Sequence, residues 1–122
     1  MKVLGAHHVQ LSAPPGCEPD ARAFYVGVLG LEEIAKPREL RHQGGIWLRT
    51  PQLDIHISPR VDDTLPGPHR HLALRVVDIE AWRIKLQIAG VRIEAAEDVA
   101  GWARFFCFDP FSNKLELLEV LA

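Results

Sequence analysis

The chain has 122 residues, of which 48% are hydrophobic and 25% charged, a balance that fits one soluble globular domain with a substantial core. No apolar run approaches the roughly 20 residues that span a bilayer. A formal net charge of -2 gives no reason to expect a nucleic-acid or membrane partner. Cys17 and Cys107 lie outside any CxxC pattern, so no disulfide framework is expected and a reduced cytoplasmic setting fits best.

The first half of the chain predicts one strand, one helix and then three short strands. Alternation places Val9 and Leu11 on one face of the first strand and polar residues on the other. Pro19 suits the first turn of a helix, and Gly30 suits the left-handed position after its end. The expected elements are a strand over 7–12, a helix over 19–29, and strands over 31–35, 46–50 and 53–58.

The second half repeats this order after a linker over 61–68 that is rich in Asp, Pro and Gly. Asp78 can cap a helix whose apolar stripe includes Trp82, so this indole is expected in the core, and Gly90 ends the helix. The expected elements are a strand over 71–76, a helix over 79–89, and strands over 91–95, 103–109 and 114–120.

A nearly constant offset relates the two halves, which indicates an internal repeat. The offset is 63 residues from His8 to His71, and 60 residues both from Gly30 to Gly90 and from His56 to Glu116. One half is too small to be stable alone, so the halves should pair. The predicted fold is a single α+β domain over 1–122. Its two β-α-β-β-β modules, 1–60 and 69–122, form an open eight-stranded barrel-like sheet with a helix packed outside each half.

Strand periodicity sends four polar side chains to the concave face of the predicted sheet. On the first and last strands of each half, the alternating apolar residues should face the helices. The residues left facing inward are His8, His56, His71 and Glu116. Imidazole nitrogen and carboxylate oxygen suit one divalent transition metal such as Zn, Ni, Co, Mn, Fe or Cu, whereas Mg or Ca prefers more oxygen. We therefore predict a metal site; the alternative is a wet cleft in which these side chains are merely hydrated.

Further side chains on this face could bind a substrate through hydrogen bonds, an anion clamp or an aromatic wall. They are Gln10, Ser12, Asp54, Arg75, Arg104 and Trp47. For each of them alone, a place in a polar network lining a wet groove is the simpler interpretation, and Trp47 and Trp102 can simply pack. The three other histidines are interpreted as ordinary surface or hydrogen-bonded residues; they are His7, His42 and His69.

Four segments carry a family resemblance that covers nearly the whole chain: HVQL at 8–11, FYVGVLGL at 24–31, HLAL at 71–74 and DPFSNKLE at 109–116. They resemble the vicinal oxygen chelate superfamily, which includes glyoxalase I, extradiol dioxygenases, and fosfomycin- and bleomycin-resistance proteins. The resemblance implies paired β-α-β-β-β modules, a divalent metal in the open barrel, a small-molecule substrate and a homodimer. By position, it matches His8, His71 and Glu116 to the metal ligands of the family.

Two positions depart from the pattern of the family. His56 stands where a glyoxalase I has glutamate, which leaves Glu116 as the only carboxylate base and makes the site more positive by one charge. This difference favours an anionic or ionisable oxygen ligand. Ser112 replaces the usual glycine of the turn before the last strand, where a left-handed backbone is often wanted.

Three functions remain open. The first is a divalent-metal-dependent glyoxalase-like isomerase or lyase for a small molecule with vicinal oxygens, in which all four inward residues bind metal and Glu116 or His56 moves the proton. The second is an Fe(II) extradiol-type ring-cleaving dioxygenase with His8, His71 and Glu116 as the iron ligands and His56 as an acid or base beside them. The third is a non-enzymatic small-molecule binding protein of the bleomycin-resistance type, which needs no catalytic metal.

Overall fold

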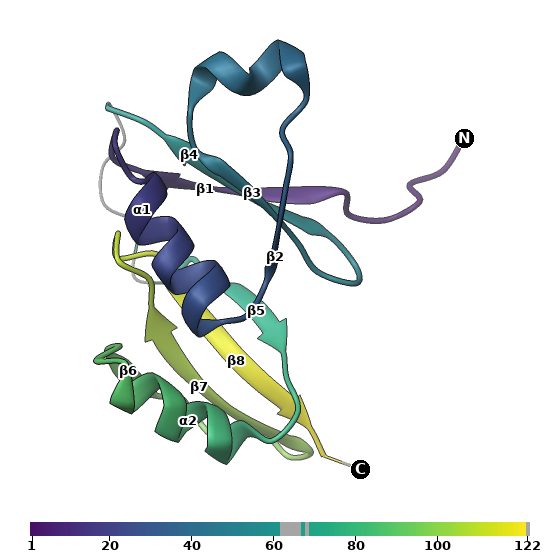
Figure 1. The fold of residues 1–122 in the computed structure, drawn as a ribbon. Helices are drawn as coiled ribbons and strands as arrows, with labels where there is room; N and C mark the ends of the chain where they lie inside the picture. Colours follow the sequence, from purple (N-terminus) through teal and green to yellow (C-terminus); the bar gives the residue numbers. More distant parts are fainter. Residues whose placement is uncertain (62–66, 68, 122) are drawn as a thin grey trace. The chain divides into compact units, whose positions relative to one another are not determined.

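A computed structural model describes residues 1–61, 67 and 69–121 of the chain (Figure 1). The chain divides into two compact units, Met1–Asp63 and Thr64–Ala122. Each unit holds a four-stranded sheet, so the predicted fold class, α+β with two β-α-β-β-β modules, is confirmed. The described strands are hydrogen-bonded as two separate sheets and form no closed barrel. The single domain stays a prediction, and most of the predicted linker 61–68 lies outside the described residues.

The first unit contains a mixed sheet with the strand order β1-β4-β3-β2, in which β1 runs parallel to β4. Its apolar face is fully buried at Ile46, Leu48, Ile55 and Ile57. The opposite face carries the polar residues of the same strands, as the alternation predicted. The elements are β1 (His8–Ala13), α1 (Glu18–Ala21), η1 (Arg22–Val28), β2 (Glu32–Ile34), η2 (Arg38–Gln43), β3 (Ile46–Arg49) and β4 (Asp54–Pro59).

The helical segment of this unit differs from the uninterrupted α-helix expected over 19–29. Its second part, η1, is a π-helix, in which the amide of Leu29 donates to the carbonyl oxygen of Phe24 at 2.9 Å. Nothing in the residue pattern explains the wider turns. The 3-10 helix η2 was not expected either. An ion pair at 2.8 Å joins Arg22 of η1 to Glu33 of β2, and so connects the helical segment to the sheet of the same unit.

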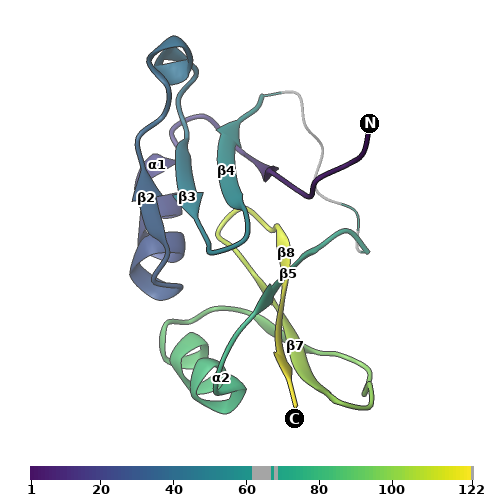
Figure 2. The same ribbon diagram turned by 90° about the vertical axis from the view of Figure 1, so that its right-hand side faces the viewer.

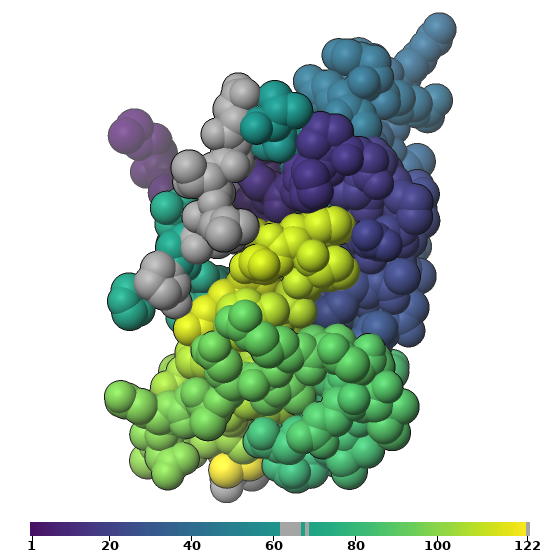
Figure 3. Space-filling view, turned by 90° about the vertical axis from the view of Figure 1, so that its left-hand side faces the viewer, coloured from purple at the N-terminus to yellow at the C-terminus, as the bar shows by residue number. Residues whose placement is uncertain are grey.

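The second unit repeats the arrangement, with the strand order β5-β8-β7-β6 and β5 parallel to β8. Helix α2 lies along the apolar face of this sheet (Figure 2), and the guanidinium of Arg83 lies 4.7 Å over the buried Phe105 ring. The same helix forms part of the surface seen in Figure 3. The elements are β5 (Leu72–Arg75), α2 (Ile79–Ile88), β6 (Ile93–Ala95), β7 (Trp102–Phe108) and β8 (Lys114–Val120).

The ends of α2 follow the sequence prediction. The side chain of Asp78 caps it by accepting from the amide of Ala81, and Gly90 is left-handed with φ of 75°. Trp82 was expected in the core, and this was wrong. Its indole is half-buried, with the Lys85 ammonium 5.0 Å from the ring, because it lies toward the edge of the buried stripe of α2. None of the helices in the described ranges is long and apolar enough to cross a membrane.

The turn before β8 is built around a buried carboxylate. Asp109 Oδ1 accepts from the amides of Phe111 at 2.9 Å and Asn113 at 2.8 Å, and Asp109 Oδ2 accepts from the Asn113 side chain at 2.8 Å. Ser112 takes the left-handed conformation with φ of 69°, as its place in the motif suggested. A non-glycine residue there costs about 1 kcal/mol, and the hydrogen bonds around Asp109 hold it in place. This turn sets where β8 begins, and therefore where Glu116 lies.

Both cysteines are buried and free. Cys107 is 0% exposed, and its burial raises the pKa of the thiol from 9.0 to about 12. We expect native protein at pH 8 to react with a thiol reagent such as DTNB at neither cysteine, and denatured protein to react at both, because only a solvent-exposed thiolate attacks. Rapid labelling of native protein would contradict the burial of Cys107.

The same burial has a consequence for stability. Above pH 9 the thiol of the unfolded chain ionises while the folded thiol keeps its proton, so the free energy of unfolding should fall as the pH rises from about 9 toward 12. Urea denaturation across this range should show a shallower decline for Cys107→Ala than for wild type.

Candidate functional site

The second unit brings two of the predicted metal ligands together. His71, just before β5, places its Nε2 atom 3.0 Å from Glu116 Oε1 on β8. Glu116 is 4% exposed, whereas Leu115 and Leu117 beside it point to the helix-covered face. Two ligands bound at about 2.1 Å to one metal ion lie about 3.0 to 3.4 Å apart. The spacing of this pair therefore fits two donors to the same ion.

The hydrogen bond of the other ring nitrogen of His71, Nδ1, determines which nitrogen carries the lone pair that can bind a metal ion. Nδ1 lies 3.0 Å from the main-chain oxygen of His69, and a carbonyl only accepts, so Nδ1 carries the hydrogen. The lone pair of the neutral ring is then on Nε2, facing a carboxylate oxygen that is also an acceptor. Contact between these two atoms needs a proton or a cation between them. A hydrogen bond from the outer nitrogen to a carbonyl is the usual arrangement of a metal-binding histidine.

Arg104 was predicted as a substrate contact, a role that stays a prediction, and in the structure it contacts Glu116. Its guanidinium lies 3.5 Å from Glu116 Oε2, and its Nε donates to the main-chain oxygen of Glu97 at 3.1 Å. Each oxygen of the buried carboxylate thus has a different partner, His71 on one side and Arg104 on the other. A buried carboxylate without such partners would cost several kcal/mol. Arg104 fixes the direction in which Oε1 is presented.

The first unit assembles three aromatic rings on the polar face of its sheet. The His56 ring on β4 stacks on the indole of Trp47 on β3, with centroids 3.8 Å apart and planes at 3°. The His8 ring of β1 stacks on the other side of His56 at 4.2 Å and 16°. The sheet register explains this contact, because Trp47 and His56 are paired across β3 and β4. Trp47 was predicted as a substrate contact, and this role stays a prediction; in the structure its indole stacks on His56.

His56 carries a buried polar atom that the rest of the unit does not satisfy. The side chain is 5% exposed, and within the part of the chain that the structure describes its Nε2 has no hydrogen-bond partner. Burial of the ring lowers the pKa of His56, and the charge of His8 beside it acts in the same direction. His56 is therefore a neutral imidazole at pH 7. A neutral ring with an unsatisfied nitrogen can accept a proton or bind a metal ion.

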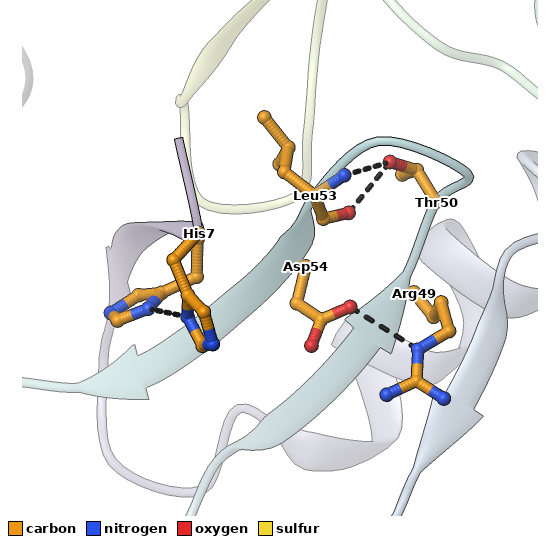
Figure 4. Close-up of polar contacts among 6 residues, drawn as sticks. His7, Arg49, Thr50, Leu53 and Asp54 are labelled. Carbon is orange, nitrogen blue, oxygen red and sulfur yellow. Dashed lines mark hydrogen bonds and ion pairs between the residues drawn. The ribbon is translucent and has the colours of Figure 1, made fainter. Parts of the chain in front are cut away.

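His8 is exposed, and its Nδ1 lies 2.9 Å from Nδ1 of His7, the residue just before β1 (Figure 4). On the same polar face, Asp54 of β4 accepts from Arg49 of β3 at 3.3 Å. His7 was interpreted as an ordinary surface or hydrogen-bonded residue, which agrees with the structure, but its contact with His8 was not predicted. The double histidine at 7–8 is the only signal in the sequence that could have suggested it.

The predicted donors of the two units are imidazole nitrogen and carboxylate oxygen, the donor types that a divalent transition metal prefers. An imidazole lone pair lies in the ring plane, so the stacked His8 and His56 rings cannot both point at one ion until one ring turns. His71 and Glu116 need no such change. Among the residues that the structure describes, no group of three or more His, Cys, Asp or Glu side chains is gathered as a metal site. Each unit brings one pair of the predicted donors into contact.

The remaining predicted substrate contacts lie on the expected faces. Gln10 is exposed on β1 and paired with His56 in the sheet register, and Ser12 is half-buried opposite Ser58. Arg75 is exposed on β5 opposite Leu118. Their faces agree with the predicted alternation, and their contact with a substrate stays a prediction.

Two β-α-β-β-β repeats, each with one four-stranded mixed sheet, define a small α+β protein built from an internal repeat. The family model of the Glyoxalase/Bleomycin resistance protein/Dioxygenase superfamily matches residues 5–117. The chain therefore belongs to this superfamily, whose members commonly bind a divalent metal. A comparison with curated proteins finds no match.

Solved structures agree with this assignment. A glyoxalase family protein from Bacillus anthracis is 36% identical, with 98% of each chain covered and a TM-score of 0.90. A glyoxalase family protein from Enterococcus faecalis is 26% identical, with 95% of this chain and 98% of that chain covered and a TM-score of 0.75. The fosfomycin resistance protein FosX from Listeria monocytogenes is 16% identical, covers 97% of this chain and 94% of that chain, and has a TM-score of 0.79. At that identity the last likeness concerns the fold alone.

Proposed function

We propose that the chain is a divalent-metal-dependent enzyme of the glyoxalase type, an isomerase or lyase, acting on a small molecule with adjacent oxygens. The observation that carries the proposal is the pair His71 Nε2 and Glu116 Oε1 at 3.0 Å, with Nδ1 of His71 held by a carbonyl. The proposed donors are His8, His56, His71 and Glu116. A bound divalent ion would polarise a substrate carbonyl and stabilise negative charge on its oxygen.

The residues around the donors have separate tasks in this proposal. Glu116, aligned by Arg104, or the neutral His56 would take a proton from substrate carbon and return it to the neighbouring carbon. Trp47 keeps the His56 ring in place by stacking. Arg75 and Gln10, both exposed on polar faces, would bind the oxygens of the substrate. The protein would work as a homodimer in the cytoplasm.

A second function, an Fe(II) extradiol-type dioxygenase, is favoured by one specific observation. The parallel stack of His8 and His56 leaves only one of these rings free to point at an ion without turning. His8, His71 and Glu116 would then be a set of two histidines and one carboxylate, the set typical of iron oxygenases. His56 would act beside the iron as a neutral acid or base.

The test is the metal content per chain after purification without chelator, for wild type and His71→Ala, with His42→Ala as the matched control. His42 lies exposed in η2, outside the strands that carry His8 and His56. We expect near-stoichiometric metal in wild type and in His42→Ala, and its loss in His71→Ala. Iron together with oxygen uptake on catechols would select the dioxygenase, and nickel, cobalt, zinc or manganese would direct the assays to isomerisation and lyase chemistry. A protein that neither retains nor rebinds metal would overturn both enzyme proposals and leave a metal-free binding protein.

A further inference from the structure

His7 and His8 form a contact between two side chains that are adjacent in the chain. Their Nδ1 atoms are 2.9 Å apart, within hydrogen-bond distance, and the rings meet edge to face with centroids at 5.2 Å and an angle of 82°. Figure 4 draws the contact at the start of β1. Both side chains are exposed, so burial does not force them together.

The chemistry of this contact constrains His8. A hydrogen bond between two Nδ1 atoms requires one to carry the hydrogen and the other to accept it. If His8 donates, the lone pair of its neutral ring is on Nε2. If His8 accepts, its proton is on Nε2 and the ring has no free lone pair for a metal ion. Only the arrangement in which His7 accepts leaves His8 ready to bind through Nε2.

In the second unit, the repeat-equivalent histidine, His71, also has its Nδ1 atom in a hydrogen bond. There, Nδ1 of His71 donates to the main-chain oxygen of His69 at 3.0 Å. The first unit uses a side chain, His7, where the second uses a backbone carbonyl. In both units, Nδ1 of this histidine is in a hydrogen bond with a residue one or two positions earlier in the chain. When Nδ1 donates that bond, Nε2 is left with the lone pair that can bind a metal ion.

We propose that His7 is a positioning residue for His8: it accepts from Nδ1 of His8, holds the ring orientation and fixes Nε2 as the nitrogen that binds the metal ion. This inference rests on the proposed function, in which His8 is a donor. An outer hydrogen-bond partner of this kind raises the affinity of a metal site by about 10- to 100-fold.

The experiment compares three variants of the full chain. His7→Phe keeps an aromatic ring but has no atom that can accept a hydrogen bond from Nδ1 of His8. His7→Asn places Oδ1 as many bonds from Cβ as Nδ1 is in histidine, so the acceptor returns. His42→Phe is the matched control, because it makes the same substitution at an exposed histidine of η2 that is no part of the proposed site. The measurements are the Zn²⁺ dissociation constant, by competition with a chromophoric chelator, and the ¹⁵N chemical shifts of the His8 ring in metal-free protein.

We expect His7→Phe to bind Zn²⁺ about 10- to 100-fold more weakly, and the His8 ring to move its proton from Nδ1 toward Nε2. His7→Asn should recover most of the affinity and the Nδ1–H form, and His42→Phe should behave as wild type. Wild-type affinity and an unchanged His8 ring in His7→Phe would overturn the proposal. So would an Asn variant no better than the Phe variant, because the ring edge rather than the acceptor would then matter. If wild type binds no Zn²⁺, the proposed function fails, and the ¹⁵N shifts alone decide whether His7 orders the His8 ring.

Discussion

Glu116→Gln should lose tight divalent-metal binding while the chain stays folded. Glutamine keeps the shape of the side chain and one acceptor oxygen, but it removes the negative charge from the buried position between His71 and Arg104. The loss in affinity should exceed the roughly 10- to 100-fold caused by removing an outer hydrogen-bond partner, because Glu116 is itself a proposed donor. Zn²⁺ competition titration measures it.

The control for this prediction is Glu94→Gln. Glu94 lies on β6, its side chain is 46% exposed, and its partner Arg92 is a surface residue. The same change of charge there should leave the metal affinity unaltered. Equal affinities for wild type and Glu116→Gln would remove Glu116 from the set of donors.

A second substitution, at Arg104, separates the effect of Glu116→Gln on metal binding from its effect on stability. In Glu116→Gln the largely buried guanidinium of Arg104, 17% exposed, loses its carboxylate, which should cost about 1–3 kcal/mol of unfolding free energy. Adding Arg104→Gln removes the uncompensated charge, so the double variant should regain part of that stability in urea denaturation. It should not regain the metal. Recovery of metal binding in the double variant would mean that the charge of Arg104, and not the missing carboxylate, had prevented it.

The sequence predicted the fold well because the fold depends on periodicity. Alternating apolar residues assigned both faces of β1, β4 and β8, and the constant offset between halves identified the repeat. The predicted range of the last strand, 114–120, agrees with β8 residue for residue. Glycine at the ends of the helices also proved reliable, because Gly30 and Gly90 have φ of 74° and 75°. Such positions report backbone conformation directly.

The site was predicted less completely, because its details depend on the direction of single side chains. Alternation placed Arg104 on the polar face, but only the structure reveals its contact with Glu116. The stack of Trp47, His56 and His8 depends on sheet register, which sets which residues are neighbours across strands. His7 is one residue outside the strand pattern, so periodicity assigned it no face.

The two units use the same positions of the repeat with different chemistry. Unit one offers an exposed histidine beside a buried, neutral one, held by aromatic stacking. Unit two offers a histidine beside a buried carboxylate that an arginine holds by charge. The repeat-equivalent residues His56 and Glu116 therefore differ in charge, although they lie on the equivalent strands β4 and β8 of the two units.

Gly45→Ala should destabilise the chain by at least about 3 kcal/mol, the range of a severe core defect. Gly45 has φ of 80°, and a Cβ atom there would lie well inside 3.0 Å of the main-chain oxygen of Ile57. Backbone cannot move aside as a flexible side chain can, so β3 would have to shift against β4. The Gly45 amide also donates to Glu18 at 2.9 Å, which ties α1 to the sheet and would be strained as well.

Gly30→Ala is the matched control for this prediction. Gly30 is left-handed too, with φ of 74°, but a Cβ atom there would meet nothing within 4 Å. It should therefore show the conformational cost alone, about 1 kcal/mol. Urea denaturation of both variants isolates the steric part as the difference between them. Equal losses of unfolding free energy in the two variants would mean that β3 moves away from Ile57 at little cost. The stack of Trp47 on His56, which joins β3 to β4, would then be held less firmly than the close packing at Gly45 implies.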